Sequence, residues 1–323
     1  MRFNNRDDII QLTPLWDGER MPDGRPRVSD DVLRRIKNTT MEEMWAPMVR
    51  QGYKFQHESR MRRTNPDMDV VVGRAFTATY MRTRPDLAGY LIDYGHNVEG
   101  RKGGFNQWPL DELSKDDFMV NDMYGKTREG CPWGGNLTTL IAQKTGVGGL
   151  CWGGVRDLDQ IKGIKNAQFY YLETDPTPFM ESMCVGINVP VQIGMAVCMP
   201  GDVVLGTESG VIFIPAHLAE ACVIDAEKTH ARDIWGFTRL HEGKYSAAHI
   251  DSPWDLAMWE DFYAWFGVAE EAVPYKHLSF DEEMYDIRNG IRRMPPVLDA
   301  YGRPVKRPAN AEAPKTPAED TRW

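Results

Sequence analysis

The chain has 323 residues, of which 42% are hydrophobic and 26% are charged, an ordinary composition for a folded domain. This composition excludes collagen-like and wholly disordered chains, and the length suffices for a sizeable core without disulfide or metal cross-links. The formal net charge of −9 disfavours a non-specific nucleic-acid binder, because such a protein needs a basic face to displace counterions from phosphates. We therefore expect no nucleic-acid partner.

Neither a membrane segment nor a secretory signal is predicted. No run of about eighteen apolar residues occurs, and the first residues, MRFNNRDDIIQL, lack the apolar stretch of a signal peptide. The five cysteines are odd in number and widely spaced, and no CxxC pair occurs, which disfavours a structural zinc site. We expect reduced core thiols in a cytoplasmic protein without membrane contact.

The N-terminal region is predicted to be an extended arm followed by helices. Residues 1–29 mix glycine, proline and charge and indicate the arm. Ser29 is placed to cap a helix through DDVLRRIKN, with Asp30 and Asp31 near its positive end. A second helix is expected in TMEEMWAPMVRQG, ending at Gly52.

From about residue 69, short apolar runs bounded by glycine, proline and aspartate alternate with helical segments. This pattern predicts a compact α/β domain over residues 30–245. The expected strands are VVVGRAFTATYM, DDFMVNDMYG, GLCWGGV, AQFYYLET, VPVQIGMAVCM, GDVVLG and GVIFIP, and the expected helices are LAGYLIDYGHNVEG, NLTTLIAQKTG and AHLAEACVIDAEKTHARDIWGFTRL.

The C-terminal part is predicted to consist of an aromatic helical segment followed by an extended tail. Residues 246–294 include the aromatic stretch SPWDLAMWEDFYAWFG, which indicates a helix packed on the body or on a neighbouring subunit. The alternative is a lid that brings aromatic walls to a pocket. Residues 295–323 contain six prolines and few apolar side chains, so we expect an extended tail.

Two segments are candidates for chemistry. In TGVGGLCWGGVRDLDQIKG, a strand is expected to run into a glycine turn at Gly153 and Gly154, followed by Arg156 and Asp157. Such a pair offers a carboxylate clamp and an oxygen ligand for Mg²⁺, although it is also a common structural ion pair. In CPWGGNLTTLIAQKTG, we expect Gly134, Gly135 and Asn136 to begin a helix. Its free amides at Asn136, Leu137 and Thr138 would form an anion site or simply a capped turn.

The order of Gly135, Arg156-Asp157 and CMPGDVVLGTESGVIFIPAHLAE resembles the RraA-like family. That family contains 4-hydroxy-4-methyl-2-oxoglutarate aldolases, oxaloacetate decarboxylases, the regulator of ribonuclease E activity, and proteins once called demethylmenaquinone methyltransferase-like. The resemblance covers roughly residues 30–240, and the long arm and aromatic extension resemble a longer branch. It implies a three-layer β/β/α swivelling domain and a homotrimer or dimer of trimers with active sites between subunits.

The resemblance also implies roles for the candidate residues. Arg156 would bind a 2-oxo acid and polarise its carbonyl, and Asp157 would ligate Mg²⁺ (or Mn²⁺). Backbone amides around Gly135, Asn136, Leu137 and Thr138 would hold the carboxylate of a small-molecule substrate. A cation and a guanidinium stabilise the enolate left when a bond beside a 2-oxo acid breaks. The implied function is a divalent-metal-dependent lyase, an aldolase or a decarboxylase.

Two positions depart from the family pattern. The aldolases carry Asp where Gly135 stands here, or where Asn136 stands after a one-residue shift, and neither residue acts as a base. The family's Asp-Gly is replaced by Trp152-Gly153. The possible pocket residues are Trp152, Asn106, Trp108 and Asp175. The alternatives are a hydratase, dehydratase or isomerase on the same scaffold, and a non-catalytic regulator that binds another protein.

Overall fold

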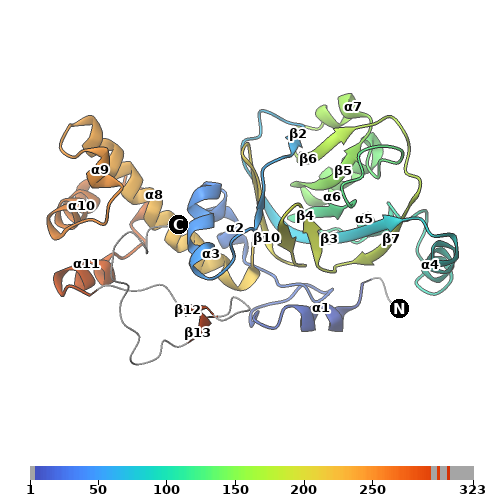
Figure 1. Cartoon of the computed structure of the whole chain (residues 1–323), viewed down its shortest axis with the longest axis horizontal. Helices are drawn as coiled ribbons and strands as arrows, with labels where there is room; N and C mark the ends of the chain where they lie inside the picture. Colours follow the sequence, from blue (N-terminus) through green and yellow to red (C-terminus); the bar gives the residue numbers. More distant parts are fainter. Residues whose placement is uncertain (1–3, 292–296, 299–303, 306–323) are drawn as a thin grey trace. The chain divides into compact units, whose positions relative to one another are not determined.

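A computed structural model describes residues 4–291, 297–298 and 304–305 (Figure 1). The chain divides into two compact units, each described by itself below. Unit 1 contains residues 1–41 and 55–219, and unit 2 contains residues 42–54 and 220–323. Most of the predicted tail over residues 295–323 lies outside the described residues. The boundaries expected at residues 29/30 and 245/246 stay predictions.

Unit 1 is built on a nine-stranded mixed sheet with the strand order β1-β11-β10-β3-β4-β5-β6-β2, while β7 also pairs with β3. Strands β3, β4, β5 and β6 run parallel to one another, so their carboxyl ends share one edge. A separate hairpin pairs β8 with β9. The strands are β1 His57–Glu58, β2 Arg62–Arg63, β3 Val71–Arg82, β4 Asp117–Asp122, β5 Gly148–Val155, β6 Gln168–Thr174, β7 Ser182–Ile187, β8 Val191–Ile193, β9 Ala196–Cys198, β10 Val203–Thr207 and β11 Gly210–Ile214.

The helices of unit 1 follow the capping signals in the sequence. Ser29 caps α2 by accepting a hydrogen bond from the Val32 N–H, as predicted. Gly146 ends α6 with a φ of 69°, a left-handed conformation that suits glycine. The helices are α1 Arg6–Leu12, α2 Asp30–Ile36, α4 Pro85–Asn97, α5 Trp108–Asp111, α6 Gly135–Thr145, α7 Leu158–Lys162 and the 3₁₀ turn η1 Ala216–Leu218.

Three layers arise because alternate strand residues point to opposite faces of the sheet. On one face, Met119 of β4 and Cys151 of β5 pack in a cluster with buried residues of α4, α5, α6 and α7. On the other face, Phe118 and Leu150 pack with residues of the β8–β9 hairpin. The helices, the large sheet and the hairpin give the α/β fold expected for an RraA-like domain, in which the parallel strands fix where the candidate site lies (Figure 1).

The structure differs from the sequence predictions in four places. The run VPVQIGMAVCM, expected as one strand, turns back on itself and forms the β8–β9 hairpin. The segment expected as an extended arm contains helix α1, and Arg25 from this segment is buried. The run SMCVGI, for which no strand was expected, forms β7. The expected glycine turn is absent, because β5 continues through Gly153 and Gly154 to Val155 with a register shift after Cys151.

Unit 2 is helical and has a core rich in aromatic residues. The aromatic stretch forms α10, and Trp235, Phe262 and Phe280 are buried together in one cluster within unit 2. Packing of this helix on the body or on a neighbouring subunit stays a prediction. Its elements are α3 Met41–Arg50, α8 Ala219–His241, α9 Ala247–Ile250, α10 Leu256–Val268, η2 Val273–Tyr275, α11 Asp281–Arg288, β12 Val297–Leu298 and β13 Pro304–Val305. Helices α3 and α8 begin at Met41 and Ala219, the last residues of unit 1 segments. Among the described residues, no helix is both long and apolar enough to cross a membrane.

Candidate functional site

The candidate site lies where β5 ends. Ligands of open parallel sheets commonly bind outside the carboxyl ends of the strands, and Arg156 and Asp157 directly follow β5 at that edge. The side chain of Arg156 is 38% exposed and that of Asp157 32% exposed, and Arg156 Nε lies 3.8 Å from Asp157 Oδ2. The structure therefore brings the two predicted residues together with both side chains reachable from solvent.

A short parallel bridge places the start of α6 beside this pair. Trp133 pairs with Val155, and the Arg156 N–H donates to the Trp133 carbonyl at 2.9 Å. The bridge brings Gly134 so close that a Cβ on it would lie 3.0 Å from both Cγ and Nε of Arg156, and closer still to Asp157 Oδ2. A side chain at position 134 would therefore displace the Asp157 carboxylate and the Arg156 side chain from the positions they hold here.

Asp157 is held in an unusual backbone conformation. Its φ of 56° and ψ of 40° are left-handed, which is uncommon outside glycine although aspartate and asparagine tolerate it best. Asp157 occupies the N-cap position of α7, yet its side chain makes no capping bond there. Instead, Oδ2 accepts a hydrogen bond of 3.2 Å from the Gly135 N–H at the start of α6. The local backbone thus turns the carboxylate toward the other helix.

The amide groups of α6 agree only partly with the prediction. Thr138 donates its N–H to the Gly134 carbonyl at 3.1 Å, as an interior helical residue does, so its amide is not free. In the described part of the chain no acceptor is recorded for the N–H groups of Asn136 and Leu137. The free amides of this helix start are therefore those of Asn136 and Leu137, and these groups attract anions.

A small hollow opens at this point. Its walls come from Asn106, Cys131, Pro132, Gly134, Asn136, Leu137, Arg156 and Phe179. Asn106 is fixed because its side-chain amide donates to the Pro132 carbonyl at 3.0 Å. Burial raises the pKa of the Cys131 thiol to about 11, so this cysteine is not a thiolate nucleophile near neutral pH.

Of the four further pocket candidates, the structure places only Asn106 at the hollow. Trp108 is fully buried in the core between the sheet and the helices. Trp152 packs on the opposite face of β5 with the hairpin cluster, and the Arg60 guanidinium lies 5.9 Å from its ring. Asp175 accepts hydrogen bonds from the N–H and hydroxyl of Thr177, which hold its pKa below the ordinary value.

The sequence reasoning missed Gln160. The side chain of Gln160, from α7, occupies the space that a side chain at position 135 would need: a Cβ on Gly135 would lie 2.9 Å from Gln160 Cδ. An aspartate at position 135 would therefore collide with Gln160 as it stands here. The spacing of three residues between Asp157 and Gln160 at the start of a helix was the available signal, because residues so spaced share one helix face.

The residues present fit a divalent cation only in a water-rich arrangement. Within residues 4–291, 297–298 and 304–305, no group of three or more His, Cys, Asp or Glu side chains could hold a metal ion. Mg²⁺, however, commonly keeps several waters and is bound through one or two carboxylates together with the substrate. Asp157 supplies one accessible carboxylate, so the donor set suits this mode and not an enclosed all-protein cage.

Comparison with known proteins supports the fold and the family. The family model described as RraA-like (Aldolase/RraA) matches residues 26–213. No curated protein sequence matches the chain.

Three solved structures are similar over 69–71% of the chain. RraAS2 from Streptomyces coelicolor, described as an unusual member of the RNase ES inhibitor RraA protein family, is 21% identical with a TM-score of 0.53, covering 69% of this chain and 98% of its own. An uncharacterized Pseudomonas syringae protein is 17% identical with a TM-score of 0.54, covering 70% of this chain and 93% of its own. A structure described under novel cellulases from gut-associated microbes is 19% identical with a TM-score of 0.54, covering 71% and 95%. At these identities the similarity shows the fold alone.

Proposed function

The chain belongs to the RraA-like family, and we propose that it is a divalent-cation-dependent carbon–carbon lyase of small 2-oxo acids that acts mainly as a decarboxylase. The family includes lyases and non-catalytic regulators, so the choice between these two functions depends on the residues of the candidate site. The observation that supports a lyase is the placement of Arg156 and Asp157 beside the free amides of α6, with both side chains exposed.

Each group has a role that its chemistry suits. The Arg156 guanidinium is a planar, always charged donor that binds the 2-oxo carbonyl or an adjacent carboxylate. The free amides of Asn136 and Leu137 hold a substrate carboxylate at the positive end of α6. Asp157 would hold Mg²⁺ or Mn²⁺, and that cation, when bound, supplies positive charge beside the oxygen that becomes an enolate.

Among the described residues that line the hollow there is no histidine, aspartate or glutamate, which favours decarboxylation over aldol cleavage. Loss of CO₂ from a 3-carboxylate moves the C3–C4 bonding pair into an enolate, and a solvent proton later reaches C3, so no group has to remove a proton. Aldol cleavage, hydration and isomerisation each need a general base. Gly135 has no side chain, Asn136 cannot accept a proton for this purpose, and Asp175 is bound to Thr177.

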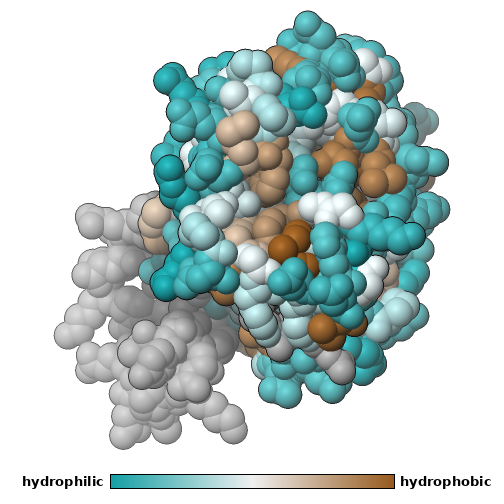
Figure 2. All heavy atoms as spheres, turned by 90° about the vertical axis from the view of Figure 1, so that its right-hand side faces the viewer, coloured by the Kyte–Doolittle hydropathy of each residue, from teal (hydrophilic) through white to brown (hydrophobic). Residues whose placement is uncertain are grey.

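As part of the same proposal, the protein assembles into a homo-oligomer, either a trimer or a dimer of trimers. Figure 2 shows apolar patches on a mainly hydrophilic face of unit 1. Exposed large apolar side chains of this unit include Met81, Tyr90 and Val98, which are 56%, 53% and 66% exposed. Apolar side chains gathered on a surface commonly mark contacts between proteins.

The test is pyruvate release from oxaloacetate and from 4-hydroxy-4-methyl-2-oxoglutarate, with Mg²⁺ or with chelator, each corrected for the reaction without protein. We expect release from oxaloacetate that needs the cation and falls about 10²-fold or more in Asp157→Asn and Arg156→Met. The matched control is Asp159→Asn, an exposed acid two residues further along the chain. Equal rates of pyruvate release in wild type and Asp157→Asn would contradict the assignment of the reaction to this site. No release from a folded chain would favour the regulator that docks on another protein.

A further inference from the structure

A second hollow lies at the opposite edge of the parallel strands from the candidate site. The register pairs Arg74 with Asp117 and Phe118 with Gly148, so the amino ends of β3, β4 and β5 lie together. The hollow at this edge has a volume of about 290 Å³, just below the range of about 300–1,000 Å³ that is usual for small-molecule sites. It shares no lining residue with the hollow beside Arg156.

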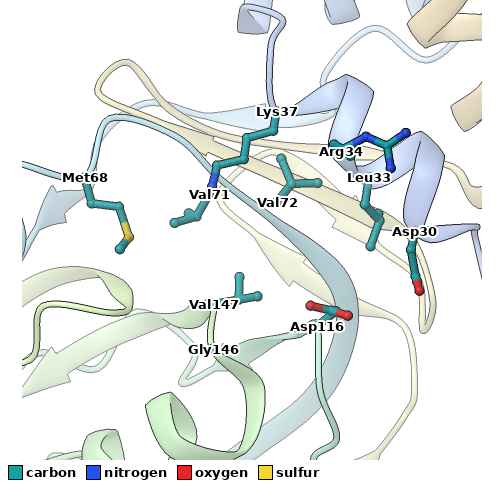
Figure 3. Close-up of a pocket in the computed structure, with 10 residues that line it drawn as sticks. All are labelled: Asp30, Leu33, Arg34, Lys37, Met68, Val71, Val72, Asp116, Gly146 and Val147. Carbon is teal, nitrogen blue, oxygen red and sulfur yellow. The ribbon is translucent and has the colours of Figure 1, made fainter.

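The hollow has an apolar floor and charged walls. Figure 3 shows α2 on one side, with Lys37 reaching toward the start of β3, and Asp116 on the other side. The apolar residues that line it are Leu33, Met68, Val71, Val72 and Val147. A ligand here would therefore bury an apolar body of modest size between two charged walls.

Two of the four charged residues at the hollow already have partners. Asp30 pairs with Arg74, and Arg34 pairs with Asp31. In the described part of the chain, by contrast, no hydrogen bond or ion pair is recorded for the side chains of Lys37 and Asp116. One free cation and one free anion thus face the same small space.

Asp116 is also held in a left-handed conformation, with a φ of 65°. Its backbone explains why it stays there: the Asp116 carbonyl accepts a 2.8 Å hydrogen bond from the Arg74 N–H, and its own N–H donates to the Thr145 carbonyl at 3.0 Å. The main chain at position 116 is therefore held by β3 and α6, and the described part of the chain leaves the carboxylate itself without a partner. A held backbone lowers part of the entropic cost of binding a ligand.

We propose that this hollow binds a zwitterionic α-amino acid with an aliphatic side chain, such as L-leucine. Lys37 pairs with the ligand carboxylate, Asp116 pairs with its ammonium group, and the aliphatic side chain covers the valine floor. The opposite free charges complement the two charges of an amino acid, whereas a simple carboxylate or a simple amine leaves one of them unpaired. The site is separate from the one in the proposed function and does not depend on it.

The experiment is calorimetric titration of the full chain with L-leucine, with 4-methylpentanoate, which lacks the ammonium group, and with 3-methylbutylamine, which lacks the carboxylate. We expect saturable binding of one leucine per chain and binding of each analogue weaker by about tenfold or more, since a hydrogen bond to a charged group is lost. Lys37→Met and Asp116→Asn should each weaken leucine binding by a similar factor. Asparagine tolerates the left-handed backbone, so this substitution keeps the local conformation.

Control variants distinguish leucine binding in this hollow from leucine binding elsewhere on the chain. Lys115→Met and Asp67→Asn change exposed neighbours that do not line the hollow and should bind leucine as wild type does.

The variant Arg156→Ala should also bind leucine normally. Loss of binding in this variant would assign leucine to the hollow beside Arg156 and overturn the proposal. No binding at millimolar leucine, or equal binding of either analogue, would overturn it too. So would dissociation of an oligomer by Lys37→Met, because the hollow would then be a subunit contact. If Asp116→Asn fails to fold, Lys37→Met decides, because Lys37 is exposed at the end of α2.

Discussion

Arg25 forms a two-pronged ion pair with Asp117, 92 residues further along the chain, and both side chains are almost completely buried. The distances are 2.8 Å from Nη1 to Oδ1 and 3.2 Å from Nη2 to Oδ2. Arg25 also donates to Asp23 and to the Ala75 carbonyl, and the Ser114 N–H and hydroxyl donate to Asp117. This network ties the N-terminal segment to the amino ends of β3 and β4.

Arg25→Met should therefore destabilise unit 1 strongly. Removing one member of a buried ion pair leaves an uncompensated charge, which costs about 3–5 kcal/mol. Arg27→Met is the matched control, because the ion pairs of Arg27 within the described residues are with the exposed Glu19 and Asp30, and such pairs contribute about 0–1 kcal/mol. Urea unfolding measures both. Equal midpoints for the two variants would contradict a structural role of the buried pair, and Arg25→Met/Asp117→Leu should regain part of the loss.

Gly134→Ala should disturb the candidate site without unfolding the chain. The added methyl group would collide with Asp157 Oδ2 and press on Arg156, so both side chains must move. A misplacement of about 1 Å costs about 10²-fold in rate, and we expect a loss of that order in oxaloacetate decarboxylation.

Gly89→Ala is the control for this substitution. Gly89 lies in α4, is exposed, and a Cβ there meets nothing within 4 Å. Alanine is favoured over glycine inside a helix by about 0.5–1 kcal/mol, so this variant should be slightly more stable and fully active. If Gly134→Ala were as active as Gly89→Ala, the close approach at position 134 would have no bearing on the reaction.

The strands and helices of unit 1 were largely predictable, whereas the side-chain neighbours were not. The alternation around Phe118 and Met119 is visible in the sequence and sets the two faces of β4. The burial of Arg25 was not predictable, because its partner Asp117 is distant in the sequence and the segment around Arg25 has no periodic pattern of hydrophobic residues. Gln160 was missed for the same reason, since its overlap with position 135 depends on how α6 and α7 meet. The error at Thr138 arose from a helix boundary, which sequence patterns fix only to within one or two residues.

The five cysteines should react slowly in the folded chain. All five are buried and free, and burial raises the pKa of Cys184 and Cys222 to about 12. Only the thiolate reacts with a disulfide reagent, so few thiols should be modified near pH 8 and five in denaturant. Rapid modification of one thiol in the native chain would locate an opening that this fold does not show.

The stability of the chain should fall with rising pH between about pH 4 and pH 7 through Asp202. This residue is buried, and burial raises the pKa of its carboxyl group to about 7, although Oδ2 accepts a hydrogen bond of 2.8 Å from the Met199 N–H. Because the folded state keeps the proton and the unfolded state releases it near pH 4, folding is disfavoured as pH rises through this window. Each unit of pKa difference corresponds to about 1.4 kcal/mol, so the loss is a few kcal/mol.

The test is the variant Asp202→Asn, which keeps an oxygen for the Met199 N–H and removes the titration. The slope of the unfolding free energy against pH should then be smaller in the variant, measured by urea unfolding from pH 4.5 to 8. Parallel curves for the two proteins would show that Asp202 is ionised throughout this range in the folded chain.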